Sequence, residues 1–200
     1  HVIVVCETPL AFLPLGNSSI VRTAVQRAVE AVCRPTVSVW VSEAAARAFE
    51  LAPKNLLPKC DVAVGVPLAD HARGRAEEVV LLHDAQRPLT LSSTFDRVAS
   101  AVIGGAVAAR PAHVVVDTLK RMGPDGRVLG TVDRNTVQSL TSPEGYLRSS
   151  LNGEQSADHW LLGFGEGEQK LVAGDQESLR VREASGRFRS LPRGWRGPLA

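Results

Sequence analysis

Short apolar runs recur along the chain up to residue 116, and stretches of helical periodicity separate them. Residues 2–6 form an unbroken, mostly β-branched apolar run, which is typical of a strand buried on both faces. The same pattern predicts strands at residues 36–41, 61–66, 78–83, 106–109 and 113–116. Helices are predicted behind Asn17-Ser18-Ser19, over residues 42–51, and from a Ser92-Ser93 cap to about residue 103, where Gly104-Gly105 ends the last one.

Continuous apolar strands that alternate with amphipathic helices predict a parallel sheet covered by helices on both faces. We therefore expect an α/β fold, a Rossmann-like three-layer sandwich with a mostly parallel sheet. Such sheets bind their ligands beyond the carboxyl ends of the strands. The residues that directly follow strands are thus the first candidates for a functional site.

The pattern of apolar and polar residues changes after residue 116. Residues 117–135 are polar and carry a Gly123-Pro124-Asp125-Gly126 turn between two short extended runs, which predicts a β-hairpin. Its flanks are too polar for the main core, so we expect a projecting arm that contacts a partner chain. Residues 1–186 are predicted to form one domain, and the Gly/Pro/Arg-rich residues 187–200 are predicted to form a basic tail.

Composition narrows the class of protein. The chain has 200 residues, 44% of them hydrophobic, and a formal net charge of +2, which suits a single globular domain and argues against a dedicated nucleic-acid binder. It contains no apolar stretch of membrane-spanning length and no secretion-signal pattern, so we expect a cytoplasmic protein without a membrane partner. Cys6, Cys33 and Cys60 are expected to be small buried hydrophobes, and their spacing argues against a zinc site.

The segment LLHDAQRP carries the sharpest chemical signal. A buried strand ends there at His83-Asp84, and Arg87 and Pro88 follow. A carboxylate at this position is well placed to hold a divalent cation that neutralises phosphate charge. Arg87 would orient Asp84 or clamp an anion. The alternative is that Asp84 and Arg87 pair only to fix the turn.

The arm carries a second polar constellation. Thr118, Lys120, Arg121, Arg134 and Asn135 place cationic groups on both sides of the hairpin, where a phosphate would receive several charge-assisted hydrogen bonds. The alternative is a solvated hairpin whose cations pair with its own aspartates.

Several motifs, taken together and in order, resemble the methylerythritol phosphate cytidylyltransferases of isoprenoid biosynthesis. The family pattern has a strand ending in HDAARP, an arm with DT-x-KR and TVDRN, and an LTPQ-like turn. This chain has LLHDAQRP, DTLKR, TVDRN and SLTSP at the corresponding spacings. AFLPLGNSSIVRTAVQRAVE resembles the lead-in to the family's first helix, and LVAGDQESLRV resembles its late GDQ-x-N-x-KVT segment. The resemblance covers residues 2–182.

The resemblance implies a GT-A-like nucleotidyltransferase fold and transfer of a CMP unit from CTP to a sugar-alcohol phosphate. It also implies Mg²⁺ as cofactor and a homodimer with interlocking arms. By position, Asp84 would be the metal ligand and Arg87 its support, while Arg180 stands where the family has a catalytic Lys. Thr118 and Arg134 would bind the sugar phosphate from the partner's arm, and Thr141 would flank the pocket.

The departures from the pattern fall on the nucleotide half of the site. The family's first strand leads into PAAG-x-G-x-R and then PK, whereas here Cys6-Glu7-Thr8-Pro9-Leu10 runs directly into FLPLG. Glu7 adds negative charge where a phosphate should lie, and Pro9 removes a backbone donor. The GG-x-x-R-x-x-SV segment before Asp84 is also shortened, and only Arg73 or Arg75 remains as a candidate for its arginine.

Three hypotheses follow from these departures. The first is a homologue with impaired or absent catalysis that keeps the fold, the arm and a phosphate-binding remnant. The second is an active transferase for this or another sugar-alcohol phosphate. In it, Arg73, Arg75 or the tail arginines would replace the arginine and lysine of the family's first loop. The third is a structural dimer without a ligand. Loss of even one electrostatic donor from such a site costs about 3 kcal/mol of transition-state stabilisation, so the first is favoured.

Overall fold

Four parallel strands form one side of the sheet in the computed structural model, which describes residues 1–151 and 169–182. They are β1 (Val2–Cys6), β4 (Val37–Val41), β5 (Asp61–Val64) and β6 (Val79–Asp84), and they lie in the order β6-β1-β4-β5. β1 pairs in parallel with β4 on one side and with β6 on the other. The predicted mostly parallel sheet is confirmed, and β1 is an inner strand of its parallel part.

The sheet continues beyond β6 with strands of mixed direction. β11 (Glu144–Leu147) pairs antiparallel with both β6 and β7 (Ala108–Val114). β7 also pairs antiparallel with β10 (Gln138–Leu140) and parallel with β12 (Gln169–Ala173). The late segment of the chain therefore returns to the sheet beside β7.

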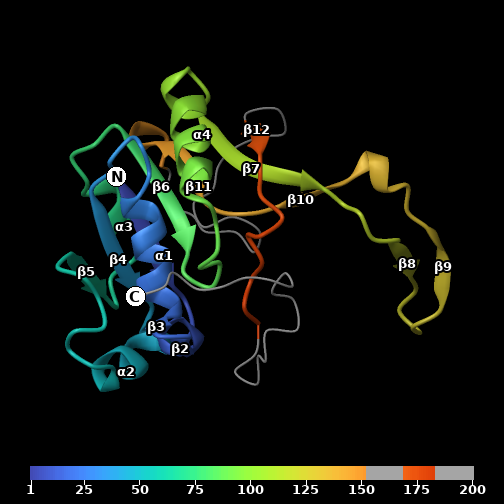
Figure 1. The fold of residues 1–200 in the computed structure, drawn as a ribbon. Coiled ribbons are helices and arrows are strands. Elements are labelled where there is room, and N and C mark those ends of the chain that lie inside the picture. The colour runs from blue at the N-terminus through green and yellow to red at the C-terminus, as the bar shows by residue number, and fades with distance from the viewer. Residues whose placement is uncertain (152–168, 183–200) are drawn as a thin grey trace.

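Helices cover both faces of the parallel strands. One face packs against α1 (Ile20–Val29), α2 (Glu43–Leu51) and α4 (Ser92–Ile103), and the other packs against α3 (Leu68–Arg73) (Figure 1). β1 shows why two cores arise, because alternate side chains of a strand point to opposite faces. Its side chains at 2, 4 and 6 join the α1–α4 core, and those at 3 and 5 join the α3 core. No helix in the described part of the chain is long and apolar enough to cross a membrane.

Helix capping follows the sequence at α1 and α2 but not at α4. Ser19 and Ser42 are N-caps whose hydroxyls accept from backbone N–H groups three residues on. The predicted Ser92 cap of α4 is wrong, because Leu91 occupies the N-cap position and Ser92 is already helical. Gly104 ends α4, as predicted.

Three other details differ from the sequence-based expectation. The two strands predicted at 106–109 and 113–116 are one strand, β7, that runs through Pro111. Proline has no backbone N–H to donate, and it is tolerated here because the strand uses only its carbonyl. That carbonyl accepts a hydrogen bond from the Thr141 N–H at 2.8 Å. Cys33 is exposed and Cys60 is half-buried, so only Cys6 is the buried hydrophobe that the pattern predicted for all three cysteines.

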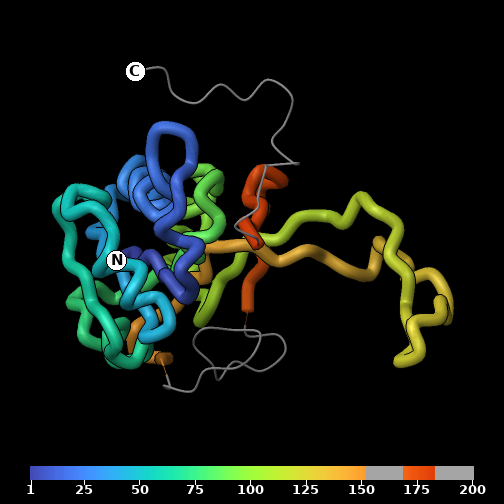
Figure 2. Tube along the Cα trace, turned by 90° about the horizontal axis from the view of Figure 1, so that it is seen from below, coloured from blue at the N-terminus to red at the C-terminus, as the bar shows by residue number. Residues whose placement is uncertain are grey.

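The predicted hairpin is present as an arm that extends away from the sheet (Figures 1 and 2). Its strands are β8 (Lys120–Met122) and β9 (Val128–Thr131), followed by the short helix η2 (Arg134–Thr136). The turn at 123–126 closes through a Gly123 N–H bond to the Arg127 carbonyl at 2.8 Å. The predicted tail at 187–200, and the end of the predicted domain at 186, lie outside the described residues.

The remaining short elements surround the first turn and the sheet edge. The helix η1 (Pro9–Phe12) and the paired β2 (Pro14–Leu15) and β3 (Ser18–Ser19) connect β1 to α1. The helix η3 (Arg148–Ser150) follows β11. The chain between β1 and α1 is therefore an ordered turn that is stabilised by its own hydrogen bonds.

Gly145 of β11 has no room for a side chain. A Cβ at this position would lie 2.5 Å from Cγ1 of Val98 and 3.2 Å from Cγ2 of Val102, both on α4. We expect Gly145→Ala to lower the free energy of unfolding by about 1–3 kcal/mol, because the core cannot expand without strain. Urea denaturation measures this, with Gly130→Ala as control, since nothing lies within 4 Å of a Cβ at Gly130. Equal effects of the two substitutions would contradict the packing described for β11 against α4.

Candidate functional site

The ends of β1 and β6 meet at one edge of the sheet. Val5 pairs with Asp84 in the parallel register, and the Ala85 N–H donates to the Val5 carbonyl at 3.0 Å. Glu7, two residues later in the chain than Val5, and Asp84 therefore follow neighbouring strands. The structure brings together the residues that directly follow strands, which is where the sequence places the candidate site.

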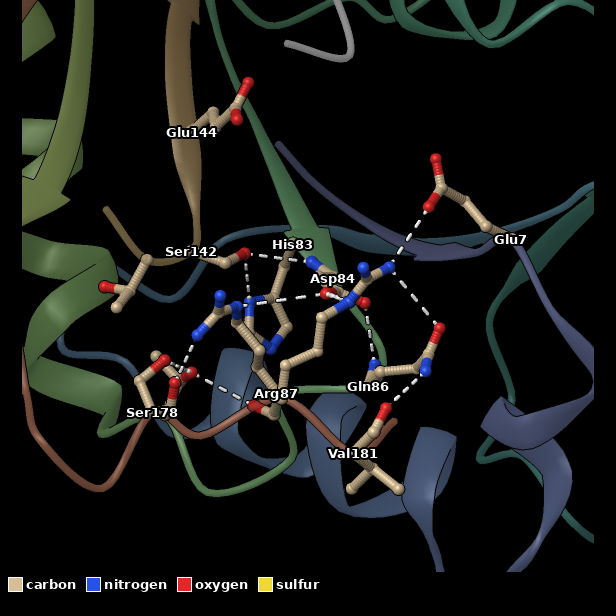
Figure 3. A network of polar contacts seen from close by, with 12 residues as sticks. Glu7, His83, Asp84, Gln86, Arg87, Ser142, Glu144, Ser178 and Val181 are labelled. Carbon is tan, nitrogen blue, oxygen red and sulfur yellow. Dashed lines mark hydrogen bonds and ion pairs between the residues drawn. The ribbon is translucent and has the colours of Figure 1, made fainter. Parts of the chain in front are cut away.

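The carboxylate of Asp84 is buried and accepts bonds on both oxygens (Figure 3). Its Oδ1 accepts the Gln86 backbone N–H at 2.9 Å, and its Oδ2 lies 2.7 Å from Nε of Arg180 and 3.8 Å from Nε of Arg87. Burial raises the pKa of Asp84, while Arg180, the Gln86 N–H and Arg87 oppose that rise. The carboxylate is therefore held by donors from its own chain.

Arg180 joins Asp84 to the first turn. Its terminal nitrogen Nη2 lies 3.3 Å from Oε2 of Glu7 and 3.5 Å from Oε1 of Gln86, whose side chain also accepts from Oγ1 of Thr8 at 3.2 Å. The side chains of Arg180 and Glu7 are 37% and 36% exposed, whereas that of Asp84 is 7% exposed. One guanidinium thus spans a buried carboxylate and a solvent-facing one.

Residues 174–182, which we term the C-terminal segment, fix the position of Arg180. The Val181 N–H donates to the Gln86 carbonyl at 2.8 Å, and the Gln86 side-chain amide donates to the Val181 carbonyl. Arg87 donates to the Ser178 carbonyl, and the hydroxyls of Thr90 and Ser178 lie 2.6 Å apart. These bonds fix the backbone on both sides of Arg180, and this backbone position allows the guanidinium to reach Asp84.

His83 and Ser142 support Asp84 from inside the protein. The Ser142 hydroxyl accepts the Asp84 backbone N–H at 2.9 Å and lies 2.9 Å from Nδ1 of His83. The His83 ring is fully buried and packs edge-on against Phe95. Burial, and secondarily the charge of Arg87, lower the pKa of His83 to about 3, so the ring is neutral.

Cationic side chains predominate around this edge. Burial lowers the pKa of Arg87, Asp84 raises it, and the neighbouring guanidiniums of Arg180, Arg110 and Arg182 lower it further. Arg110 is itself paired with the buried Glu144 at 2.6 Å. A cluster of guanidiniums beside two strand ends is suited to bind an anion such as phosphate.

The same arrangement does not fit a divalent cation as it stands. Magnesium bound beside phosphates uses one or two carboxylates. Here both oxygens of Asp84 already accept from donors, and two guanidiniums lie beside them. Among the described residues no group of three His, Cys, Asp or Glu side chains is arranged to hold a metal.

Comparison with known proteins gives this site its context. Residues 5–184 match the family model described as "IspD: 2-C-methyl-D-erythritol 4-phosphate cytidylyltransferase". A protein of that name from Nocardia farcinica is 32% identical over 162 residues, which are 76% of this chain and 68% of that protein. The chain belongs to the 2-C-methyl-D-erythritol 4-phosphate cytidylyltransferase family.

Other relatives agree with this assignment. A bifunctional enzyme IspD/IspF from Clavibacter michiganensis is 34% identical over 114 residues, and the match spans 54% of this chain and 28% of that enzyme. The cytidylyltransferase structure from Thermus thermophilus shares the fold with a TM-score of 0.72 at 22% identity, covering 92% of this chain and 93% of that one. The chain spans about a quarter of the length of the first curated relatives it matches.

The residues that the family resemblance assigned to catalysis and metal binding converge in the structure. Asp84, Arg87 and Arg180 lie in one polar network. Thr141 is buried, and its hydroxyl lies 3.4 Å from the Pro111 carbonyl. Its neighbour Ser142 is the residue that contacts Asp84. The roles of these residues in binding stay predictions.

The arm and the other candidate cations lie elsewhere. Thr118 and Arg134 belong to the arm, which extends away from the ends of β1 and β6 (Figures 1 and 2). Arg134 donates to the Val116 carbonyl at 2.7 Å. Arg75 pairs with Asp61 at the amino end of β5, the opposite edge of the parallel strands from Asp84. Arg75 therefore does not lie beside Asp84.

Sequence reasoning missed three members of the network, Gln86, Ser142 and Ser178. Gln86 had a visible signal, because the family pattern has a small apolar Ala at this position of the motif and this chain has a long polar side chain. Its side chain is buried, and it links the first turn to the C-terminal segment. Ser142 and Ser178 act through long-range contacts, which no local pattern reveals.

The neutral, buried His83 predicts a pH-dependent stability. Its folded pKa of about 3 lies below the unfolded value of 6.5, so only the unfolded chain gains this proton as the pH falls from about 6.5 towards 3. We expect the free energy of unfolding to fall over that range, by at most about 1.4 kcal/mol per pH unit from this group. Comparing urea denaturation of the wild type and His83→Gln across these pH values isolates the contribution. An unchanged slope in the variant would contradict it.

Proposed function

We propose that this family member binds a phosphorylated ligand, CTP or a sugar-alcohol phosphate, at the edge where β1 and β6 end, and that its cytidylyl transfer is strongly impaired or lost. The observation that carries the proposal is the position of Glu7. Its carboxylate lies 3.3 Å from Arg180, the residue that stands in place of the family's catalytic lysine. Without a ligand, Glu7 and Asp84 thus together engage the cation that the reaction would direct at a phosphate.

The shortened first turn supports the same proposal. Pro9 begins η1 directly after Thr8, so this turn presents no run of glycine-flanked N–H groups of the kind that wraps a triphosphate. The cluster of arginines remains and supports retained affinity for a phosphate group. Binding without turnover is therefore the expected behaviour, and a cytoplasmic location is part of the proposal.

Turnover and binding are tested separately. We expect calorimetry to detect binding of CTP or methylerythritol phosphate, while pyrophosphate release with CTP, methylerythritol phosphate and Mg²⁺ stays near background. Each lost electrostatic donor costs about 3 kcal/mol of transition-state stabilisation. Loss of several donors therefore predicts a rate at least about 10³-fold below that of an active relative assayed in parallel. A rate within tenfold of that relative would overturn the proposed impairment.

The alternative is an active transferase, and the convergence of Asp84, Arg87 and Arg180 favours it. In that case Asp84 would hold Mg²⁺ and Arg180 would turn to the substrate, which requires the bond between Asp84 and Arg180 to open. Any turnover observed should then be abolished in Asp84→Ala. Turnover that persists in this variant would remove Asp84 from the site.

We further propose that the chain is a homodimer joined through the arm at 117–135. The arm exposes apolar side chains at more than half of their surface: Met122, Val128 and Leu129. A thin two-stranded arm that exposes such side chains is unstable alone in water. In the dimer, Thr118 and Arg134 would reach the partner's site.

Light scattering tests the dimer. We expect the wild type to have twice the chain mass, and the triple substitution of Met122, Val128 and Leu129 by Ser to shift it to the monomer, because the apolar contact is removed. Ile103→Ser is the control, since Ile103 is 73% exposed at the end of α4 and lies outside the arm. A monomeric wild type, or a dimer that survives the triple substitution, would contradict the proposed interface.

A further inference from the structure

We propose that Arg180 serves as a built-in cation at Asp84 in place of a divalent metal, and that Glu7 occupies on Arg180 the position of a ligand phosphate. The chain would then bind phosphate esters without a divalent cation, and the incoming phosphate would displace Glu7. This inference deepens the proposed function, because it assumes that a phosphorylated ligand binds at this edge.

The two ends of the Glu7–Arg180–Asp84 bridge differ in environment. The bond between Arg180 and Asp84 is short, at 2.7 Å, and the Asp84 side chain is 7% exposed. A buried carboxylate without a cationic partner is strongly unfavourable, so this half of the bridge persists. It satisfies the charge of Asp84 as a bound metal ion otherwise would.

The other half of the bridge is weak and accessible. Glu7 and Arg180 are 3.3 Å apart, and each side chain is more than one-third exposed. Ion pairs of this kind contribute little to stability, because water screens them. A phosphate group offers more charge and more acceptor oxygens than one carboxylate, and guanidinium geometry suits it. A phosphate would therefore compete successfully for this face of Arg180.

The surrounding structure keeps Arg180 in place during such an exchange. Val181 is bonded to Gln86 through both its N–H and its carbonyl, and Ser178 is bonded to Arg87. Gln86 also accepts from Thr8, directly after Glu7. When Glu7 leaves, the guanidinium would therefore stay between Asp84 and solvent.

A divalent cation is disfavoured at the same place by charge. Two guanidiniums lie beside the Asp84 oxygens, and the nearer is at hydrogen-bond distance. A metal ion would have to displace Arg180 from Asp84 and then remain close to a displaced positive charge. The ligand that this arrangement favours is anionic, a phosphate monoester or the phosphate chain of a nucleotide.

Calorimetry with inorganic pyrophosphate and with CTP, each in excess EDTA or in excess Mg²⁺, tests the inference on four proteins. The wild type should bind at least one probe in EDTA, with an affinity no more than about twofold weaker than in Mg²⁺. Glu7→Gln should bind it about three- to tenfold more tightly, because the competing carboxylate is gone. Glu30→Gln, which breaks an exposed pair with Arg27, is the matched control and should match the wild type.

Arg180→Met provides the opposite arm of the experiment. It should lose at least about tenfold in affinity in EDTA and should regain binding when Mg²⁺ is added, because Asp84 is then available to a metal. Thermal unfolding checks that each variant is folded. If Arg180→Met does not fold, the response of Glu7→Gln and the EDTA comparison on the wild type decide.

The outcomes separate this inference from the proposed function. Binding that needs Mg²⁺ in the wild type, or an unchanged affinity in Glu7→Gln, would overturn the inference and leave phosphate binding in place. Absence of binding of either probe to the wild type and to Glu7→Gln, with and without Mg²⁺, would overturn the phosphate-binding proposal and the inference with it.

Discussion

The buried carboxylate of Asp84 is the constraint around which this edge of the protein is arranged. Asp84 ends β6, so its place is set by the parallel pairing with β1, and its side chain is 7% exposed. A carboxylate in that environment requires strong donors, since burial disfavours its charged form. Arg180 and the Gln86 backbone supply them. The C-terminal segment, although distant in sequence, is thus bound to the ends of β1 and β6 by the need to satisfy one charge.

The first turn adapts to the same network. Glu7 faces the exposed side of Arg180, and Thr8 bonds to the Gln86 side chain while its hydroxyl also caps η1. Gln86 is long enough to reach both the turn and Val181. The first turn, the glutamine within the HDAQRP motif and the arginine at 180 therefore belong to one polar network, which lies where β1 and β6 end.

Periodicity predicted the layers well, because burial on two faces leaves a clear pattern. The apolar side chains that form the unbroken run of β1 and the helical spacing of α1 are buried in the two cores. It was less successful where tertiary contact overrides local preference. Pro111 lies inside β7 because only its carbonyl is needed there, and Leu91 rather than Ser92 precedes the first turn of α4.

The site was predicted only where a motif marked it. Asp84 and Arg87 were predicted from the end of the strand and Arg180 from the family pattern, and the structure adds that the three share one network. The partners Ser142 and Ser178 were not found, because each lies more than fifty residues away from the residue it supports. Whether a carboxylate faces a metal or a guanidinium depends on which distant side chain reaches it, and no local spacing specifies that.

An arginine and a magnesium ion satisfy a carboxylate in different ways. A metal ion can bind phosphate oxygens and release them with the product, and its charge lies between the two anions. A guanidinium attached to the chain binds a phosphate on one face while its other face stays on the carboxylate, and it remains after the ligand leaves. Such an arrangement holds a phosphate but offers less charge to a developing transition state. If Arg180 replaces the metal as we propose, this one exchange would account for both phosphate binding and impaired transfer.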